Sequence, residues 1–285
     1  ARCIKSNAIS FKVYKYSFLL TIVELKQLSM EILGIDVGGT GIKGVPVNLE
    51  TEDYLGERFR LPTPIPRKPK SMINTIAEVV KEWDWKGAVG VGFPTVMKNG
   101  MAMQHGNLDP SWVGMQVDKV IEDKIGLPVA VINDADAAGL AEMTFGAGRG
   151  QNGLVMVITI GTGIGSGVFF NGELIPNFEL GQMRYKKKMI IEKYASRSVR
   201  LKNDMSFKKW GKRFDKFLHL VTLMSNPDLI IIGGGASKNL HLFEKYLTID
   251  TPIVAAETQN KAGIIGAALA ARHLVVELPE ESLKK

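Results

Sequence analysis

The chain has 285 residues, of which 45% are hydrophobic and 23% are charged. No apolar stretch approaches the roughly 18 residues that a membrane-spanning helix needs. The single cysteine, Cys3, excludes a disulfide framework or a thiolate zinc site within one chain. This composition favours a globular protein of a reducing compartment, which we expect to be the cytoplasm.

The net charge of +7 is unevenly distributed along the chain. Segment 184–216 contains 13 Lys or Arg residues against 3 Asp or Glu, so it carries +10 and the rest of the chain carries −3. A concentrated basic segment favours a polyanionic partner. Charge alone leaves a second interpretation open, in which these side chains form a solvated helix face.

Residues 1–29 differ in character from the residues that follow. They are basic, with a short apolar run at 18–23, and Met30 stands directly before the first strong strand pattern. The run is short for a secretory signal. We therefore interpret 1–29 as an extension outside the fold.

The first half of the chain alternates strands, turns and helices. The turn Gly38-Gly39-Thr40-Gly41 separates two apolar strand patterns, which predicts a hairpin. Ser71 is expected to cap a helix, because apolar residues recur from 72 to 83 at helical spacing. Strands are predicted at 32–37, 42–49, 88–92 and 127–132, with a further helix at 117–125 that ends at Gly126.

The second half repeats the order of apolar strand, glycine turn and strand. A continuously apolar strand is predicted at 154–160, a glycine turn at 161–167, and a hairpin turn at Asn171-Gly172. The other predicted elements are helices at 135–145, 206–224 and 261–274 and strands at 168–170 and 229–232. The repeated order indicates two related lobes with a ligand cleft between them.

Each half offers one glycine-threonine turn that could bind phosphate. Asp36 precedes the turn Gly38-Gly39-Thr40, and the second turn is Gly161-Thr162-Gly163. Glycine lets backbone N–H groups face an anion, threonine adds a hydroxyl donor, and an aspartate at a strand end can hold Mg²⁺. The second turn is not a dinucleotide fingerprint, because a strand follows it instead of a helix, and a Walker lysine motif is absent.

Asn133 and Asp134 end one predicted strand and begin one predicted helix. Asn and Asp are preferred helix caps, which alone could explain both residues. In the functional interpretation, Asp134 accepts the proton of an acceptor hydroxyl and Asn133 hydrogen-bonds a neighbouring one.

Several longer strings resemble the ROK family of sugar kinases. They are IDVGGTGIKG, VINDADAAGLAE, VITIGTGIGSG, PNFELGQ and IIIGGG. Within that family, GERFRLPTP, GNLDPSW, MSFKKWGKR and TPIVAAETQNKAGIIGAALAA are similar to the polyphosphate, or polyphosphate/ATP, glucokinases. The resemblance extends over about Met30 to Leu274.

The resemblance implies an α/β fold of the actin-like (ribonuclease H-like) ATPase type. The small lobe would comprise 30–134 and 263–285, and the large lobe 135–262. It also implies transfer of a phosphoryl group from polyphosphate or ATP to the 6-hydroxyl of glucose. Two alternatives stay open: an ATP-dependent glucokinase or mannokinase that does not use polyphosphate, and a catalytically poor sugar sensor. The sensor is disfavoured because ROK repressors need an N-terminal helix-turn-helix, for which 1–29 is too short.

The resemblance also assigns residues to roles. Asp134 would be the general base. The sugar-binding set would be Asn107, Asn133, Glu179, Gln182 and Glu192. The phosphate- or nucleotide-binding set would be Asp36, Gly38, Gly39, Thr40, Lys43, Thr162, Gly163, Gly233, Gly234 and Gly235.

The sequence departs from the common ROK pattern at two points. Gln182 stands where ROK kinases commonly have a histidine, so the side chain cannot titrate near neutral pH. The cysteine-rich zinc motif of many members is absent, and no structural zinc is expected.

We expect Mg²⁺, held through water by Asp36, and glucose or mannose as acceptor. Polyphosphate would run along 184–216, the chain would form a homodimer, and neither a specific nucleic acid nor a membrane would be a partner.

Overall fold

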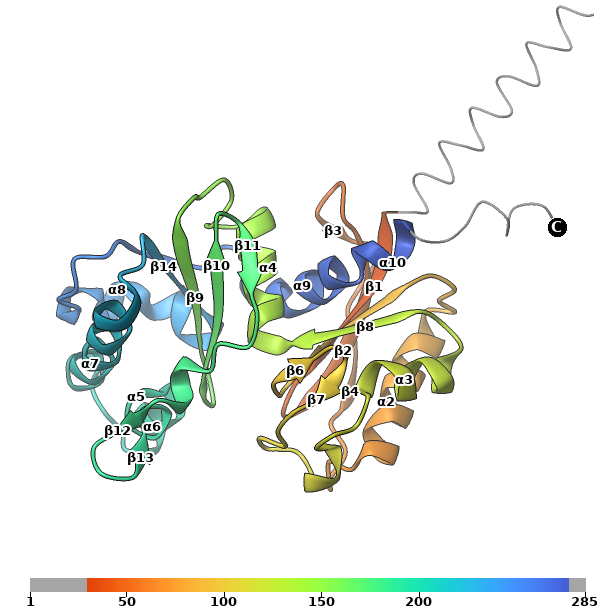
Figure 1. Cartoon of the computed structure of the whole chain (residues 1–285), viewed down its shortest axis with the longest axis horizontal. Coiled ribbons are helices and arrows are strands. Elements are labelled where there is room, and N and C mark those ends of the chain that lie inside the picture. Colours follow the sequence, from red (N-terminus) through yellow and green to blue (C-terminus); the bar gives the residue numbers. More distant parts are fainter. Residues whose placement is uncertain (1–29, 277–285) are drawn as a thin grey trace, which may run out of the picture.

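The computed structural model describes residues 30–276, which form two lobes, each built on one β-sheet (Figure 1). The predicted extension 1–29 and the last residues of the predicted small lobe, 277–285, lie outside the described residues. The small lobe is on the right of Figure 1, and the large lobe is on the left.

The small-lobe sheet has the strand order β3-β2-β1-β5-β8, and β4 also pairs with β2. Apolar side chains alternate along β1, so Leu33, Ile35 and Val37 contribute to the core that includes α2 and α3. Asp36 has the opposite parity and therefore lies on the other face. The elements are β1 (Glu31–Val37), β2 (Gly41–Asn48), β3 (Asp53–Tyr54), β4 (Phe59–Pro62), α2 (Pro69–Glu82), β5 (Val89–Phe93), α3 (Val117–Ile125) and β8 (Val129–Asn133).

The large-lobe sheet has the order β11-β10-β9-β14-β15. The central strands β9 and β14 are buried on both faces, as their continuous apolar sequences indicate, whereas the edge strands β11 and β15 are largely exposed. Met156 and Ile158 of β9 pack in the cluster that contains α7, whereas Val155 and Val157 pack with Met143 of α4. The elements are α4 (Asp134–Phe145), β9 (Leu154–Ile160), β10 (Ile164–Phe170), β11 (Glu173–Ile175), α7 (Phe207–Ser225), β14 (Leu229–Gly233), α8 (Leu240–Phe243) and β15 (Ile253–Ala255).

Helices α4 and α9 (Ala262–Ala270) cross between the two sheets (Figure 1). The crossing is a backbone contact, because a Cβ atom added at Gly266 would lie 1.6 Å from the carbonyl oxygen of Ala137. Helix α9 approaches the small-lobe sheet equally closely: a Cβ atom at Gly90 would lie 1.8 Å from the carbonyl oxygen of Ala267. Glycine is required at both positions for steric reasons.

Short elements complete the described chain. A two-stranded hairpin of β6 (Met97–Lys98) and β7 (Met101–Ala102) borders the small lobe, and a second hairpin of β12 (Arg184–Tyr185) and β13 (Met189–Ile190) borders the large lobe. The remaining α-helices of the described residues are α5 (Glu192–Ala195), α6 (Arg197–Lys202) and α10 (Arg272–Val276), and short 3-10 helices occur at Pro110–Trp112, Leu180–Gln182, Gly234–Asn239, Glu244–Tyr246 and Gln259–Lys261. Among residues 30–276, no helix is both long and apolar enough to cross a membrane.

The sequence prediction was wrong in three local details. Helix α2 begins at Pro69 and not after Ser71, because proline is well suited to the first helical turn; the Ser71 hydroxyl instead donates to the carbonyls of Pro66 and Lys68. The second glycine turn ends at Gly163, and β10 starts at Ile164. The predicted helix 261–274 is interrupted at Ala271, which separates α9 from α10.

Candidate active site

A cleft of about 630 Å³ lies between the two lobes. It is lined by both glycine turns, by the end of β8 and by the loop that follows β11. The predicted site residues on its wall are Gly38, Gly39, Thr40, Asn107, Asn133, Asp134, Thr162, Gly163, Glu179, Gln182, Glu192 and Gly234. Asp36, Lys43, Gly233 and Gly235 are not part of this wall: Gly233 and Gly235 adjoin Gly234, which is, and Asp36 and Lys43 are on the two strands that flank the first glycine turn.

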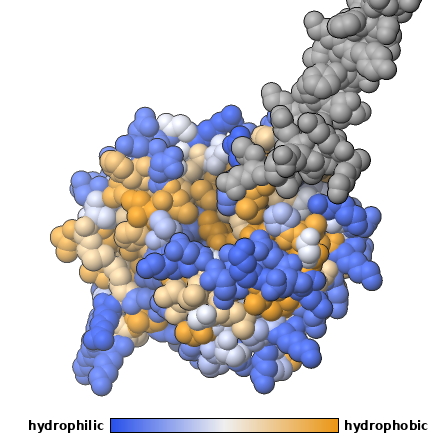
Figure 2. Space-filling model, turned by 45° about the vertical axis from the view of Figure 1, so that its right-hand side comes forward, coloured by the Kyte–Doolittle hydropathy of each residue, from blue (hydrophilic) through white to orange (hydrophobic). Residues whose placement is uncertain are grey.

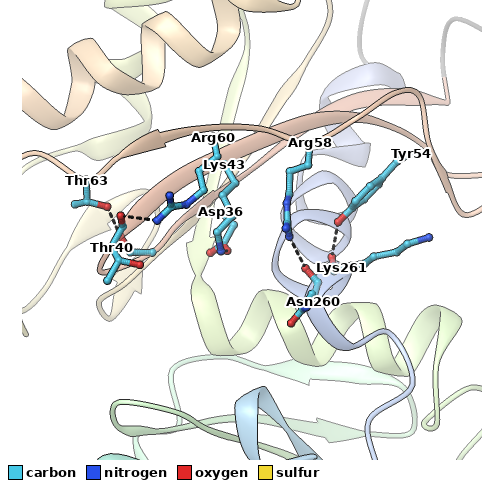
Figure 3. A network of polar contacts seen from close by, with 10 residues as sticks. Asp36, Thr40, Lys43, Tyr54, Arg58, Arg60, Thr63, Asn260 and Lys261 are labelled. Carbon is cyan, nitrogen blue, oxygen red and sulfur yellow. Dashed lines mark hydrogen bonds and ion pairs between the residues drawn. The ribbon is translucent and has the colours of Figure 1, made fainter. Parts of the chain in front are cut away.

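The first glycine turn is held in place by its carbonyl groups. Thr63 donates its hydroxyl to the carbonyl oxygen of Gly38 at 2.6 Å, and Arg67 and Arg60 donate to those of Gly39 and Thr40 at 2.9 Å each. The contacts of Thr40, Arg60 and Thr63 can be followed in Figure 3. The N–H groups of Gly39 and Thr40 form no hydrogen bond with another residue of 30–276. The turn therefore presents free backbone donors beside the cleft, as a phosphate site requires.

Asp36 and Lys43 form an ion pair directly behind this turn. Antiparallel pairing of β1 and β2 places the two residues opposite each other, and Lys43 Nζ lies 3.1 Å from Asp36 Oδ2 (Figure 3). Both side chains are about a quarter exposed, at 24% for Asp36 and 27% for Lys43. The pair therefore offers one carboxylate and one ammonium group to charged ligands of the cleft.

The second glycine turn is held in the same way from the large lobe. The hydroxyl of Ser198 donates to the carbonyl oxygen of Thr162 at 2.6 Å, and the N–H of Ser198 donates to that of Gly161 at 3.2 Å. Arg197, the preceding residue, lies alongside Gly235: its guanidinium carbon is 3.6 Å from the position of a Cβ atom at that glycine. Arg197 thus lies beside one predicted phosphate-binding segment and directly precedes the residue that holds the other. Sequence reasoning counted it only as part of the basic segment, because nothing local distinguishes it from its basic neighbours.

Asn133 is the N-cap of α4, as one of the two interpretations of the sequence required. Its Oδ1 atom accepts the N–H groups of Ala135 at 2.8 Å and Asp136 at 3.1 Å, and its Nδ2 atom donates to the carbonyl oxygen of Thr95 at 3.1 Å. One Nδ2 hydrogen is left for a ligand. The cap and a ligand contact are therefore compatible in this residue.

The carboxyl group of Asp134 is on the cleft wall at the first turn of α4. Its surface is open to the cleft, but the surrounding protein desolvates it, and this raises the pKa of Asp134 from 3.8 to about 7. The negative charge of Asp36, and more weakly that of Glu179, acts in the same direction. A carboxylate whose pKa is near neutrality is well matched to accepting a proton from a hydroxyl group.

Two further carboxylates reach the cleft from the large lobe. Burial and repulsion by Glu192 raise the pKa of Glu179. Glu192 begins α5, and its Oε2 atom accepts the N–H of Ile164 at 3.2 Å. Gln182 and Asn107 complete this part of the wall. The wall is therefore rich in groups that accept or donate hydrogen bonds, as a polyhydroxylated ligand would need.

The basic segment 184–216 is part of the large lobe and comprises β12, β13, α5, α6 and the first half of α7. Some of its cations are engaged within the protein: Lys186 and Arg213 lie over the ring of Tyr194, at 5.1 and 4.6 Å from its centroid, and Arg200 lies over Phe207. Others, including Lys187, Lys188, Lys208, Lys209 and Lys212, are exposed. Hydrophilic residues project at the lower left of Figure 2, the side on which Figure 1 places β12 and β13.

Comparison with known proteins accounts for this arrangement. Residues 32–178 match the profile of the ROK family, and polyphosphate glucokinase of Mycobacterium tuberculosis is 45% identical over 238 residues, which cover 83% of this chain and 89% of that protein.

The chain belongs to the ROK family.

Solved structures of this family share the fold. The inorganic polyphosphate/ATP-glucomannokinase of Arthrobacter sp. strain KM is 41% identical, with a TM-score of 0.81 over 86% of this chain and 99% of that one. A ROK family glucokinase from Streptomyces griseus, solved with glucose and AMPPNP, is 25% identical, with a TM-score of 0.74 over 85% of this chain and 99% of that one. The expected actin-like α/β fold is thereby confirmed. The boundary between the lobes at 134/135 stays a prediction.

Proposed function

We propose that this ROK protein is a glucokinase that transfers the terminal phosphoryl group of inorganic polyphosphate or ATP to the 6-hydroxyl of glucose. The observation that carries the proposal is the position of Asp134. Its carboxyl group, with a pKa of about 7, faces a cleft that has one glycine-threonine turn on each lobe. The names of the two polyphosphate-using relatives support the same donor and acceptor.

In the proposed reaction, Asp134 takes the proton of the 6-hydroxyl as that oxygen attacks the terminal phosphorus. A bond forms between the sugar oxygen and phosphorus, and the bond from phosphorus to the donor's bridging oxygen breaks. The products are glucose 6-phosphate and either ADP or a polyphosphate shorter by one unit. Asn107, Asn133, Glu179, Gln182 and Glu192 would orient the sugar hydroxyls, since all five are on the cleft wall.

The donor would lie between the two glycine turns. The free N–H groups of Gly39 and Thr40 would bind its reacting phosphate from the small lobe, and Thr162 and Gly163 from the large lobe. Gly233, Gly234 and Gly235 would be next to the distal phosphates or the nucleotide, with Arg197 beside them. A long polyphosphate chain would then continue along the exposed cations of 184–216.

Mg²⁺ fits the donor set near Asp36. No group of three Asp, Glu, His or Cys side chains suited to a metal ion occurs within 30–276, but Mg²⁺ commonly uses one or two carboxylates together with water and substrate phosphates. Asp36 is accessible, and Lys43 balances its charge in the free protein. When bound, the ion would offset charge on the phosphate oxygens. A homodimeric state, acceptance of mannose and a cytoplasmic location are further predictions.

A coupled assay of glucose 6-phosphate formation tests the proposal most directly. The purified chain is given glucose and Mg²⁺ with either ATP or long-chain polyphosphate, at matched phosphoryl concentrations. Turnover with polyphosphate supports the full proposal. Turnover with ATP alone would leave the ATP-dependent glucokinase or mannokinase, and turnover with neither donor for any hexose would refute both.

A further inference from the structure

The loop 176–182 carries Glu179 and Gln182 to the cleft, and Asn177 fixes its start. Asn177 has a φ of 66°, in the left-handed region that Asn adopts more readily than most residues. Its backbone N–H donates to Asp136 Oδ2 at 2.9 Å. Asp136 is 1% exposed and is two residues after the proposed base. The start of the loop is therefore bonded to the first turn of α4.

The side chain of Asn177 makes a second connection, to the other lobe. Its Oδ1 atom accepts the N–H of Met97 at 3.0 Å, and its Nδ2 atom donates to the carbonyl oxygen of Met97 at 2.7 Å. The side-chain amide thus pairs with both polar groups of one residue, as a neighbouring β-strand would. Met97 begins β6 and is buried in the small-lobe core. These two hydrogen bonds link residues 80 positions apart across the lobe boundary.

Both neighbours of Glu179 are also fixed. The hydroxyl of Ser166 donates to the carbonyl oxygen of Phe178 and accepts the N–H of Leu180 at 3.1 Å. Ser166 belongs to β10 and is 3% exposed. Glu179 is therefore held between two peptide groups bonded to the large-lobe sheet, and Asn177 ties the same loop to the small lobe.

The partner segment of Asn177 lines the cleft as well. Thr95 and Val96, which precede Met97, are on the cleft wall, and the carbonyl oxygen of Thr95 accepts a hydrogen bond from Asn133. Two asparagine side chains, one beside the proposed base and one beside Glu179, therefore hold the same three-residue segment. Any change in the relative position of the lobes at this end of the cleft must break the Asn177–Met97 pair or carry the loop with it.

We propose that Asn177 is a positioning residue that couples the placement of Glu179 to the arrangement of the two lobes, through its paired hydrogen bonds to Met97. The inference rests on the proposed function, because it takes Glu179 as a sugar-binding group. It assigns Asn177 no contact with the reacting atoms. The sugar-binding loop is complete only when the β6 segment lies against it.

The substitution Asn177→Gly tests this inference with little disturbance of the backbone. Glycine tolerates a positive φ, so the variant removes only the side-chain amide. Asn171→Gly is the matched control: Asn171 also has a positive φ, of 52°, and its side chain accepts one backbone N–H, from Gly153, in a hairpin turn of the large lobe. We expect Asn177→Gly to raise the KM for glucose about 10-fold or more, consistent with the loss of two hydrogen bonds. The donor KM should be unchanged and kcat should change less than about 3-fold. The control variant Asn171→Gly should have the same KM for glucose, KM for the donor and kcat as the parent protein.

Two readouts separate the coupling from a loss of stability or from a wrong function. Hydrogen exchange of the peptide that contains Met97 should be faster in Asn177→Gly than in the parent protein, whether or not the protein turns over glucose. Glucose should slow this exchange in the parent protein and not in the variant. Unchanged exchange at Met97, or a KM for glucose equal to that of the parent, would overturn the inference. Fast exchange in a protein that phosphorylates no sugar would instead refute the proposed function alone.

Asp136 offers an independent check of the same coupling. Asp136→Asn keeps an oxygen that can accept the N–H of Asn177, whereas Asp136→Ala does not. We expect the alanine variant to raise the KM for glucose as Asn177→Gly does, and the asparagine variant to retain most of the parent affinity. Equal effects of the two substitutions would contradict the assigned role of the Asp136–Asn177 hydrogen bond.

Discussion

Asn133 caps α4 with its side-chain oxygen, and the carboxyl group of the next residue, Asp134, consequently stands at the first turn of that helix on the wall of the cleft. Strand β8 ends at Asn133 and α4 begins at Asp134, so the junction between the two elements places the proposed base. The position and the raised pKa of Asp134 at this junction lead to the first two predictions.

Asp134→Asn should lower kcat by roughly 10²–10⁴-fold, the usual contribution of a general base. The amide has nearly the same shape but cannot accept the hydroxyl proton. Glucose affinity, measured by calorimetry with no donor present, should change little. A variant with full turnover would refute the assignment of the base.

The same substitution should stabilise the free protein above neutral pH. Because the pKa of Asp134 is raised to about 7 in the folded chain from 3.8, the folded state binds more protons between these values, and its stability falls as pH rises from about 4 to 7. The asparagine side chain does not titrate, so the Asp134→Asn protein does not lose stability in this way as the pH rises. Since the group is open to solvent in the cleft, we expect only about 1 kcal/mol, or roughly 2–4 °C in Tm at pH 8, with no difference below pH 4. If Asp134→Asn and the parent protein had the same Tm at pH 8 as well as below pH 4, the pKa of the Asp134 carboxyl group would not be raised in the folded protein.

Charge reversal in the basic segment should change the KM for polyphosphate and not the KM for ATP. Lys187→Glu combined with Lys188→Glu should raise the KM for long polyphosphate severalfold, with a smaller salt dependence, and leave the KM for ATP unchanged. Both lysines are exposed beside β13. Lys81→Glu combined with Lys86→Glu makes the same change in charge on exposed positions of the other lobe. Equal losses for both donors, or equal effects of the two pairs, would exclude a polyphosphate path along 184–216.

The close approach of α9 to the small-lobe sheet should make one glycine of β5 indispensable and another replaceable. Gly90→Ala places a methyl group against the carbonyl of Ala267 and should cost about 1–3 kcal/mol, or more. Gly92→Ala, on the same face of the same strand, meets no atom closer than 3.6 Å and should change Tm by less than about 2 °C. Thermal unfolding of both variants checks this. Similar losses in the two variants would contradict the assigned role of the contact with α9, because Gly→Ala in a strand is otherwise neutral or stabilising.

Local signals in the sequence predicted the long buried strands and the helices α2, α3, α4, α7 and α9, but not the short strands β3, β4, β6, β7, β12, β13 and β15. The glycine turns and the Asn133-Asp134 junction have local sequence signals, so their positions followed from the pattern, although distant residues such as Thr63 and Ser198 hold the turns in place. The start of α2 was misplaced because Ser71 and Pro69 both signal a helix start, and the proline prevailed. The pairing of Asn177 with Met97 and the position of Arg197 beside Gly235 depend on tertiary packing. A single sequence contains no signal for either contact.

The crossing of α4 and α9 limits how the molecule can move. Because Gly266 brings the two backbones into direct contact at Ala137, sliding of one helix along the other would drive peptide groups into each other. Rotation about that point would keep the two backbones at the same separation, so we expect any relative motion of the lobes to pivot at the crossing. A few degrees of rotation at such a pivot become a displacement of several ångströms at the far rim of the molecule.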